Sequence, residues 1–366
     1  MPVELKKINK VSNSLNILSP YVGKMRPSLV DYLIEKYAAK NEYIYDPFAG
    51  SGTVLLQGWV NGFNVIGSDL NYYAFVLAMG KTHPFKSLTQ AERALAQYNI
   101  SVQKKLSDIF IEDFPEWVKS FFDEKTLKEI YAWMQMLNEN NEWFLMSCLI
   151  GILHHQRPGF LSYPSSNGAP YLRDKKYPKE HYPEMYEYRN VYERLLKKVS
   201  RVYRSIPVLD FTKTREVLYG DSSTIKIKQQ RISTIITSPP YMKSLTYARD
   251  NRLRLWFLGV NDWQSLDKMI SPSSSAFFKM MEKCFDNWSK LQKVGDKCII
   301  VVGDIKVNYD NRKMSLTDVI VNLSTKYYSL VKSYKDPIPE ARKVVKGNST
   351  IKRELILVLE RNKDNG

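Results

Sequence analysis

Cysteine is scarce in this chain of 366 residues. The three present, Cys148, Cys284 and Cys298, are odd in number and far apart. No Cys-x-x-Cys pair occurs, so the sequence offers neither a disulfide framework nor a zinc knuckle. The N-terminus lacks the apolar core of a secretory signal, and the longest apolar run, residues 143–153, is too short to cross a bilayer. We therefore expect a cytoplasmic protein with no membrane segment.

Negative charge is also in short supply. The 54 Lys and Arg residues outnumber the 38 Asp and Glu residues, which gives a formal net charge of +16. Such an excess favours a polyanionic partner, and nucleic acid is the commonest one. A membrane surface fits less well because neither end carries a basic amphipathic helix. A generally basic surface without a specific partner is the plain alternative.

The residues around a pair of glycines predict a ligand site. Residues 43–45 form a short apolar strand that ends at Asp46 and Pro47. Gly50 and Gly52 then allow a tight turn and the close approach of a ligand, and a helix is predicted to begin at Thr53. Strand, glycine turn and helix together are typical of the first crossover of an open α/β sheet. Ligands bind in such sheets beyond the carboxyl ends of the strands.

The next predicted strand, 64–68, ends in an acid that narrows the choice of ligand. At this place Asp69 can accept hydrogen bonds from a ribose diol. The chain has neither Gly-x-Gly-x-x-Gly nor a Lys-Ser/Thr pair after the turn, and the Asp46 carboxylate would repel a pyrophosphate. S-adenosyl-L-methionine fits better because acids and carbonyls can pair with its ammonium group. A purely structural glycine turn in another α/β protein is the alternative.

The spacing of apolar residues predicts three parts of the chain. Residues 1–84 and 211–366 contain the strand patterns, including a continuous apolar strand at 297–304 and an antiparallel edge pair at 328–334 and 355–359. Residues 85–210 show long helical patterns at 87–109, 115–138, 142–156 and 189–204. We predict an open, mostly parallel α/β sheet with an antiparallel edge hairpin and a largely helical insertion.

Cations and aromatic rings gather in and after this insertion. The long segment 157–176 mixes both, the helix at 189–204 is basic, and two further arginines lie soon after residue 241. Phosphates need cations and bases need rings, so we predict nucleic-acid contacts at Arg157, Tyr163, Arg173, Lys175, Lys197, Arg201, Arg249 and Arg252. A solvated helix face, or an ion pair between Arg249 and Asp250, explains some of these residues equally well.

The stretch Ser238-Pro239-Pro240-Tyr241 carries the most specific chemistry. It follows a predicted buried strand, 234–237. The two prolines fix φ and remove two N–H donors, so the backbone here can only accept hydrogen bonds. Carbonyls and a hydroxyl suit an exocyclic amine, and Tyr241 offers a ring on which a planar base can stack. Acceptors that hold the amine hydrogens favour the tetrahedral nitrogen that forms as a methyl group arrives. A proline-rich strand end without a catalytic role is the alternative.

The glycine turn and the proline motif together resemble the amino-methyltransferases of DNA. The Ser-Pro-Pro-Tyr form is similar to the cytosine-N4 branch, whereas adenine-N6 enzymes more often begin this motif with Asp or Asn. The resemblance implies a class I, Rossmann-like methyltransferase fold and a target base held by residues 238–241. It also implies cofactor contacts at Lys24, Pro27, Asp46, Pro47, Phe48, Ala49, Gly50, Gly52, Thr53, Asp69, Leu70, Asp221 and Ser222.

The implied activity is methylation of the N4 amine of a flipped cytosine at specific sites in double-stranded DNA, without a metal. The family also suggests a restriction–modification system, with a restriction endonuclease acting separately. Two features depart from the family: many members place the glycine motif after the proline motif, and the helical insertion comes one crossover earlier than usual. We therefore predict residues 85–210 only as a candidate recognition region.

Three other functions remain open. Adenine-N6 methylation of DNA is possible because Ser rather than Asp is only a tendency of the cytosine branch. Methylation of guanine in tRNA uses a similar glycine motif, but about 20 residues before the first predicted helix leave no room for an added RNA-binding domain. A non-catalytic nucleic-acid-binding module with a relic cofactor fold is disfavoured by the intact motif residues, Gly50 and Pro239 among them.

Overall fold

The computed structural model describes residues 13–166, 169–228, 231–240, 247–337 and 353–362. The described chain forms a seven-stranded sheet with the order β3-β2-β1-β4-β5-β9-β8. The parallel strands are β1 (Tyr43–Asp46), β2 (Asn64–Asp69), β3 (Arg215–Tyr219), β4 (Thr234–Thr237) and β5 (Lys297–Gly303). β9 (Arg353–Arg361) pairs antiparallel with β5, and β8 (Tyr328–Pro337) pairs antiparallel with β9. The predicted mostly parallel sheet with an antiparallel edge is therefore confirmed.

Helices cover both faces of the sheet, which explains why its central strands read as continuous apolar runs. Along β5, Ile299 and Val301 belong to one core, whereas Ile300 and Val302 belong to the other. This alternation is the period of two expected of a strand. The first core is completed by α1 (Pro27–Tyr37), α2 (Thr53–Val60) and α3 (Tyr72–Thr82). The second is completed by α12 (Ser274–Ser289) and α13 (Leu316–Ser324).

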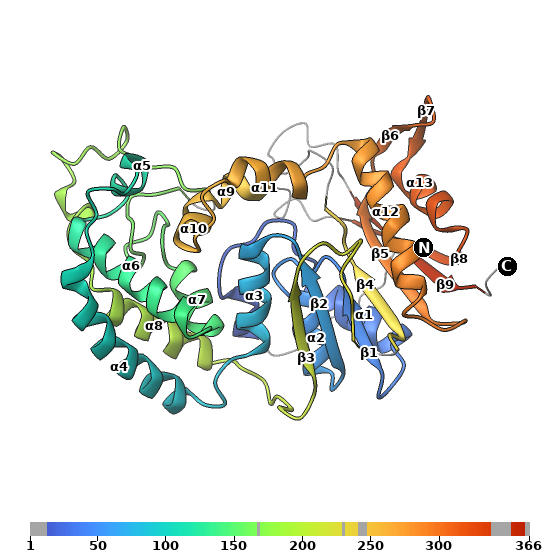
Figure 1. Ribbon diagram of the computed structural model, residues 1–366, viewed down its shortest axis with the longest axis horizontal. Helices are drawn as coiled ribbons and strands as arrows, with labels where there is room; N and C mark the ends of the chain where they lie inside the picture. Colours follow the sequence, from blue (N-terminus) through green and yellow to red (C-terminus); the bar gives the residue numbers. More distant parts are fainter. Residues whose placement is uncertain (1–12, 167–168, 229–230, 241–246, 338–352, 363–366) are drawn as a thin grey trace.

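The helical part between α3 and β3 stands to one side of the sheet (Figure 1). It contains α4 (Leu88–Lys105), α5 (Glu116–Lys119), α6 (Glu124–Glu139), α7 (Trp143–Ile150) and α8 (Val191–Tyr203), with the short 3-10 helices η2 (Leu106–Asp108) and η3 (Pro183–Met185). α7 packs closely on α3, because a Cβ at Gly80 would lie 2.1 Å from Ser147 Oγ. The apolar core of these helices is continuous with that under the sheet. The division at residues 85 and 210 thus remains a prediction about domains.

Two of the predicted helices are shorter in the structure than the sequence pattern indicated. The helix expected at 115–138 is two helices, α5 and α6, because Asp123 accepts a hydrogen bond from Thr126 N at 3.1 Å and caps a new helix. The helix expected at 142–156 ends at Ile150, although the sequence stays apolar for three more residues. A Cβ at Gly151 would lie 2.0 Å from Leu18 O, so the chain here meets another segment closely.

No bounds were predicted for several elements. η1 (Ser14–Ile17) precedes α1, and the short helices α9 (Tyr247–Asp250), α10 (Arg252–Phe257) and α11 (Trp263–Ile270) lead into α12. A small hairpin, β6 (Lys306–Tyr309) and β7 (Arg312–Ser315), follows β5. Within the described residues, every helix is too short or too polar to cross a membrane.

Candidate functional site

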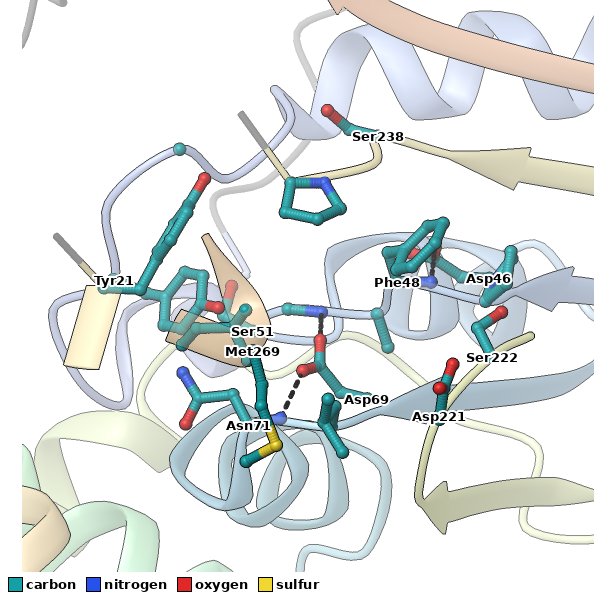
Figure 2. Close-up of a pocket in the computed structure, with 18 of the residues that line it drawn as sticks. Tyr21, Asp46, Phe48, Ser51, Asp69, Asn71, Asp221, Ser222, Ser238 and Met269 are labelled. Carbon is teal, nitrogen blue, oxygen red and sulfur yellow. Dashed lines mark hydrogen bonds between the residues drawn. The ribbon is translucent and has the colours of Figure 1, made fainter. Parts of the chain in front are cut away.

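A cavity of about 360 Å³ opens at the carboxyl ends of β1, β2 and β4 (Figure 2). β1 lies between β2 and β4 in the sheet, so the chain leaves β1 toward one side and later returns to pair on the other. The loops at such a reversal separate and leave a crevice, the usual ligand site of open α/β sheets. Of the residues predicted to hold a cofactor, all but Pro27 and Gly52 line this cavity: Lys24, Asp46, Pro47, Phe48, Ala49, Gly50, Thr53, Asp69, Leu70, Asp221 and Ser222.

The glycine turn after β1 has the tight, left-handed geometry that glycine allows. Gly50 and Gly52 have φ values of +50° and +74°, and the turn is closed by a 2.7 Å hydrogen bond from Gly52 N to Ala49 O. A Cβ at Gly52 would lie 2.8 Å from the Cα of Ala78 in α3. Gly52 therefore lets α3 pack against the back of the turn, while Gly50 faces the cavity.

Asp69 joins the glycine turn to the end of β2. One carboxylate oxygen accepts from Gly50 N at 2.7 Å and the other from Asn71 N at 2.8 Å (Figure 2). Burial raises the pKa of Asp69 to about 6, although these backbone bonds act in the opposite direction. An ionised carboxylate has about four acceptor positions, so Asp69 keeps capacity for a ligand on the cavity side.

Asp46 joins the two loops that face each other across the cavity. It is 1% exposed, and its Oδ1 accepts from the hydroxyl of Thr237 at 2.7 Å and from Phe48 N at 3.2 Å. Because Thr237 is the last residue of β4, this bond fixes the proline motif against the glycine turn. Burial raises the pKa of Asp46 to about 7.

The raised pKa of Asp46 predicts an unusual pH dependence of stability for the ligand-free protein. A carboxyl group with a raised folded-state pKa stabilises the fold fully below its unfolded pKa, and this stabilisation is lost as pH rises through about 7. The Asp46→Asn side chain stays neutral at every pH. The free energy of unfolding of this variant should therefore rise relative to that of the wild type between about pH 4 and pH 8, by up to about 4 kcal/mol. Urea unfolding across this pH range measures the difference. A constant difference between the two proteins would contradict the prediction.

The proline motif lies directly opposite the glycine turn. Ser238 and Pro240 line the cavity, and Figure 2 shows Ser238 across the cavity from Asp69. Pro239, between them in the chain, is buried and is not among the residues that line the cavity. Tyr241, the predicted stacking ring, lies outside the described residues. The glycine turn and the proline motif thus border the same cavity, although nearly 200 residues separate them in the chain.

Other lining residues escaped the sequence analysis. Tyr21 borders the cavity, and one of its ring carbons would lie 3.3 Å from a Cβ at Gly50. Its ring stacks on that of Tyr247 at a centroid distance of 6.3 Å, and burial raises the pKa of the Tyr21 phenol, which therefore stays protonated. An aromatic residue three positions before the predicted cofactor contact Lys24 was the available signal. No sequence signal indicated the apolar wall of the cavity, which comes from α11, α12 and the residues between them. It consists of Met269, Ile270, Pro272, Ala276 and Met280.

Residues predicted to contact nucleic acid fall into two groups, and none of them lines the cavity. Arg157, Lys175, Lys197 and Arg201 are exposed, and the last two belong to α8.

Tyr163, Arg173, Arg249 and Arg252 have protein contacts. Arg252 donates to Pro170 O at 3.1 Å, Arg173 donates to Gln156 at 2.8 Å, and Arg249 pairs with Asp250 at 3.7 Å. The Tyr163 ring lies 5.7 Å from the Arg189 guanidinium. Arg252 thus connects α10 to the insertion, and four of the eight predicted residues are already in contact with other protein groups.

Comparison with known proteins finds relatives of one kind, of which two are described here. The chain is 32% identical over 122 residues to the Type II methyltransferase M.MjaII of Methanocaldococcus jannaschii, covering 33% of this chain and 21% of the relative. It is 26% identical over 298 residues to the Type II methyltransferase M.MvaI of Kocuria varians, covering 70% of this chain and 62% of the relative. The chain is similar to Type II methyltransferases. It spans less than two thirds of the length of either relative.

No protein-family model matches the chain. Among solved structures, TrmN from Thermus thermophilus aligns with 93% of this chain and 50% of its own, at 10% identity and a TM-score of 0.37. The fold described above rests on the strand order and packing of the chain itself.

Proposed function

We propose that this chain is an S-adenosyl-L-methionine-dependent DNA methyltransferase that methylates the N4 amine of cytosine at specific sites. The observation that carries the proposal is the single cavity bordered by the glycine turn on one side and by Ser238 and Pro240 on the other. The hydrogen bond from Thr237 to Asp46 holds these two sides in register. The similarity to Type II methyltransferases supports the same conclusion.

The lining residues fit the cofactor. Asp69 has acceptor capacity for a ribose diol, Asp221 and Ser222 suit the adenine, and Lys24 suits a carboxylate. The hydroxyl of Thr53 is buried on the cavity wall and makes no hydrogen bond within the described residues, as expected of a group that a ligand completes. Asp46 and Asp69 favour a ligand with positive charge, and the bound cofactor would supply an activated methyl group on a sulfonium.

The proline motif would then hold and orient the target amine. A base in a duplex must leave the stack to reach such a cavity. The Ser238 hydroxyl and the Pro239 carbonyl would accept the hydrogens of its amine, and Tyr241 would stack on its ring. Since the methyl group is already activated, these residues contribute mainly positioning, an effect of roughly 7–11 kcal/mol at best. Neither a metal nor a strong general base is needed, and the described residues contain no metal-ligating cluster.

Double-stranded DNA is the proposed partner, in keeping with the net charge of +16. The exposed cations of the insertion, Lys175, Lys197 and Arg201 among them, are proposed to contact DNA phosphates, and residues 85–210 to take part in target recognition. We further propose that the enzyme belongs to a restriction–modification system whose endonuclease acts separately.

The direct test is to identify the methylated nucleoside. The protein is incubated with duplex DNA and labelled S-adenosyl-L-methionine, and the DNA is digested to nucleosides and separated. Labelled N4-methylcytosine is expected. N6-methyladenine would instead establish the adenine alternative, which the serine at position 238 disfavours but does not forbid. Label in guanine of tRNA but not in DNA would overturn the proposal.

A further inference from the structure

The hairpin β6–β7 is built as a rigid ribbon. Lys306 pairs with Ser315 at its base and Tyr309 with Arg312 at its tip. The two residues between the strands, Asp310 and Asn311, have φ values of +48° and +58°. Two left-handed residues in a two-residue loop define the type I′ turn, whose twist matches that of the paired strands. The tip is therefore held in shape by its own backbone.

The two faces of the ribbon differ in character. Val307 is buried opposite Met314, and Tyr309 on the same face meets the ring of Phe278 in α12 edge-on at 5.1 Å. Lys306, Asn308 and Lys313 lie on the other face by the period of two, and all three are exposed.

Arg312 at the tip is exposed as well. None of the three cations Lys306, Arg312 and Lys313 forms an ion pair with a described residue, and Asp310 is the one acid among residues 306–313. The hairpin thus presents uncompensated positive charge to solvent on a base anchored to α12.

The position of the hairpin connects it to the cavity. It begins three residues after β5 ends at Gly303, and therefore at the carboxyl edge of the sheet where the cavity opens. α12, which supports the hairpin through Phe278, also lends Ala276 and Met280 to the cavity wall. In Figure 1 the hairpin projects beyond α12, at the opposite end of this edge from the helical part. A long polyanion that binds at the cavity would lie along this edge of the sheet and contact the hairpin.

We propose that the β6–β7 hairpin grips the phosphate backbone of duplex DNA on the α12 side of the target base. This inference rests on the proposed function for the identity of the polymer. Duplex DNA carries one negative charge per roughly 1.7 Å of its axis, and a two-stranded ribbon is narrow enough to enter its major groove. Lys306, Lys313 and Arg312 neutralise phosphates, and the insertion contacts the duplex on the other side of the cavity.

The test compares two triple variants of equal charge. The first is Lys306→Ala, Arg312→Ala and Lys313→Ala. The control is Lys40→Ala, Lys293→Ala and Lys326→Ala, three exposed lysines that each precede β1, β5 or β8 and so lie at the opposite edge of the sheet. Affinity for a labelled duplex is measured between roughly 50 and 200 mM salt. The hairpin variant should flatten the slope of log K against log salt by about 2–3, because each lost phosphate contact removes about 0.9. The control should keep the wild-type slope.

A gain-of-charge variant keeps the test decisive if the hairpin triple variant does not fold. Asn308→Lys adds a cation between Lys306 and Lys313 on the outer face and should steepen the slope by about one. Equal slopes for wild type, Asn308→Lys and both triple variants would overturn the inference, as would a hairpin effect on RNA but not on duplex DNA. A hairpin-dependent slope without any methylated base would overturn the proposed activity and leave this contact standing. Calorimetry with the cofactor should give the wild-type affinity for every variant.

Discussion

Replacing Ser238 with alanine is expected to lower the turnover of methyl transfer by about 10- to 100-fold while leaving cofactor affinity nearly intact. As the methyl group arrives, the target nitrogen gains positive charge, and a hydrogen bond to a charged group is worth about 1.5–3 kcal/mol. The Ser238 hydroxyl lies on the cavity wall away from the glycine turn, so it should serve the base and not the cofactor. Pro239 and Pro240 offer no N–H group that could take over.

A matched variant on the facing wall makes this result specific. Thr53→Val removes the buried hydroxyl that lacks a partner among the described residues and conserves the shape of the side chain. It should weaken cofactor binding in calorimetry and leave single-turnover rates at saturating cofactor close to those of the wild type. Equal losses of turnover and cofactor affinity in Ser238→Ala would mean that residues 238–241 do not face the acceptor.

The sequence was most informative where structure depends on neighbours along the chain. The ends of β1 and β2 were predicted within a residue, because an apolar run that stops at Asp-Pro or Ser-Asp leaves little choice. Residues that the sequence singled out at two strand ends, such as Asp46 and Ser238, line one cavity. Their roles toward cofactor and base remain proposals.

The remaining features depend on contacts that no local pattern reveals. α7 stops at Ile150 because Gly151 meets Leu18, a residue more than 100 positions away. Tyr21 borders the cavity because its ring packs against Gly50 of the glycine turn. The wall from residues 269–280 is contributed by a part of the chain far from both motifs that predicted the site. The strands of the β6–β7 hairpin have four residues each and only one buried side chain between them. Their sequence therefore lacks the alternation of apolar and polar residues that would have predicted two strands.

A second large effect is expected at the glycine turn itself. Gly52→Ala should lower the free energy of unfolding by roughly 2–5 kcal/mol and also weaken cofactor binding. Part of the loss, about 1–2 kcal/mol, is the cost of a left-handed backbone for a residue with a Cβ. The remainder, about 1–3 kcal/mol, arises from overpacking, because the new Cβ would lie 2.8 Å from the Cα of Ala78. That atom belongs to the backbone of α3, which α7 holds from behind at Gly80.

Gly62→Ala separates these two costs. Gly62 follows α2 with φ +82°, a value close to the +74° of Gly52, but a Cβ there would meet nothing within 4 Å. The Gly62 variant should therefore lose only about 1–2 kcal/mol in urea unfolding and keep wild-type cofactor affinity. In Gly52→Ala the shifted turn would also draw Gly50 N away from Asp69, which ties the cofactor loop to β2. If both alanine variants lose the same stability, then α3 yields to the added methyl group, and the close packing of α3 does not explain the glycine at position 52.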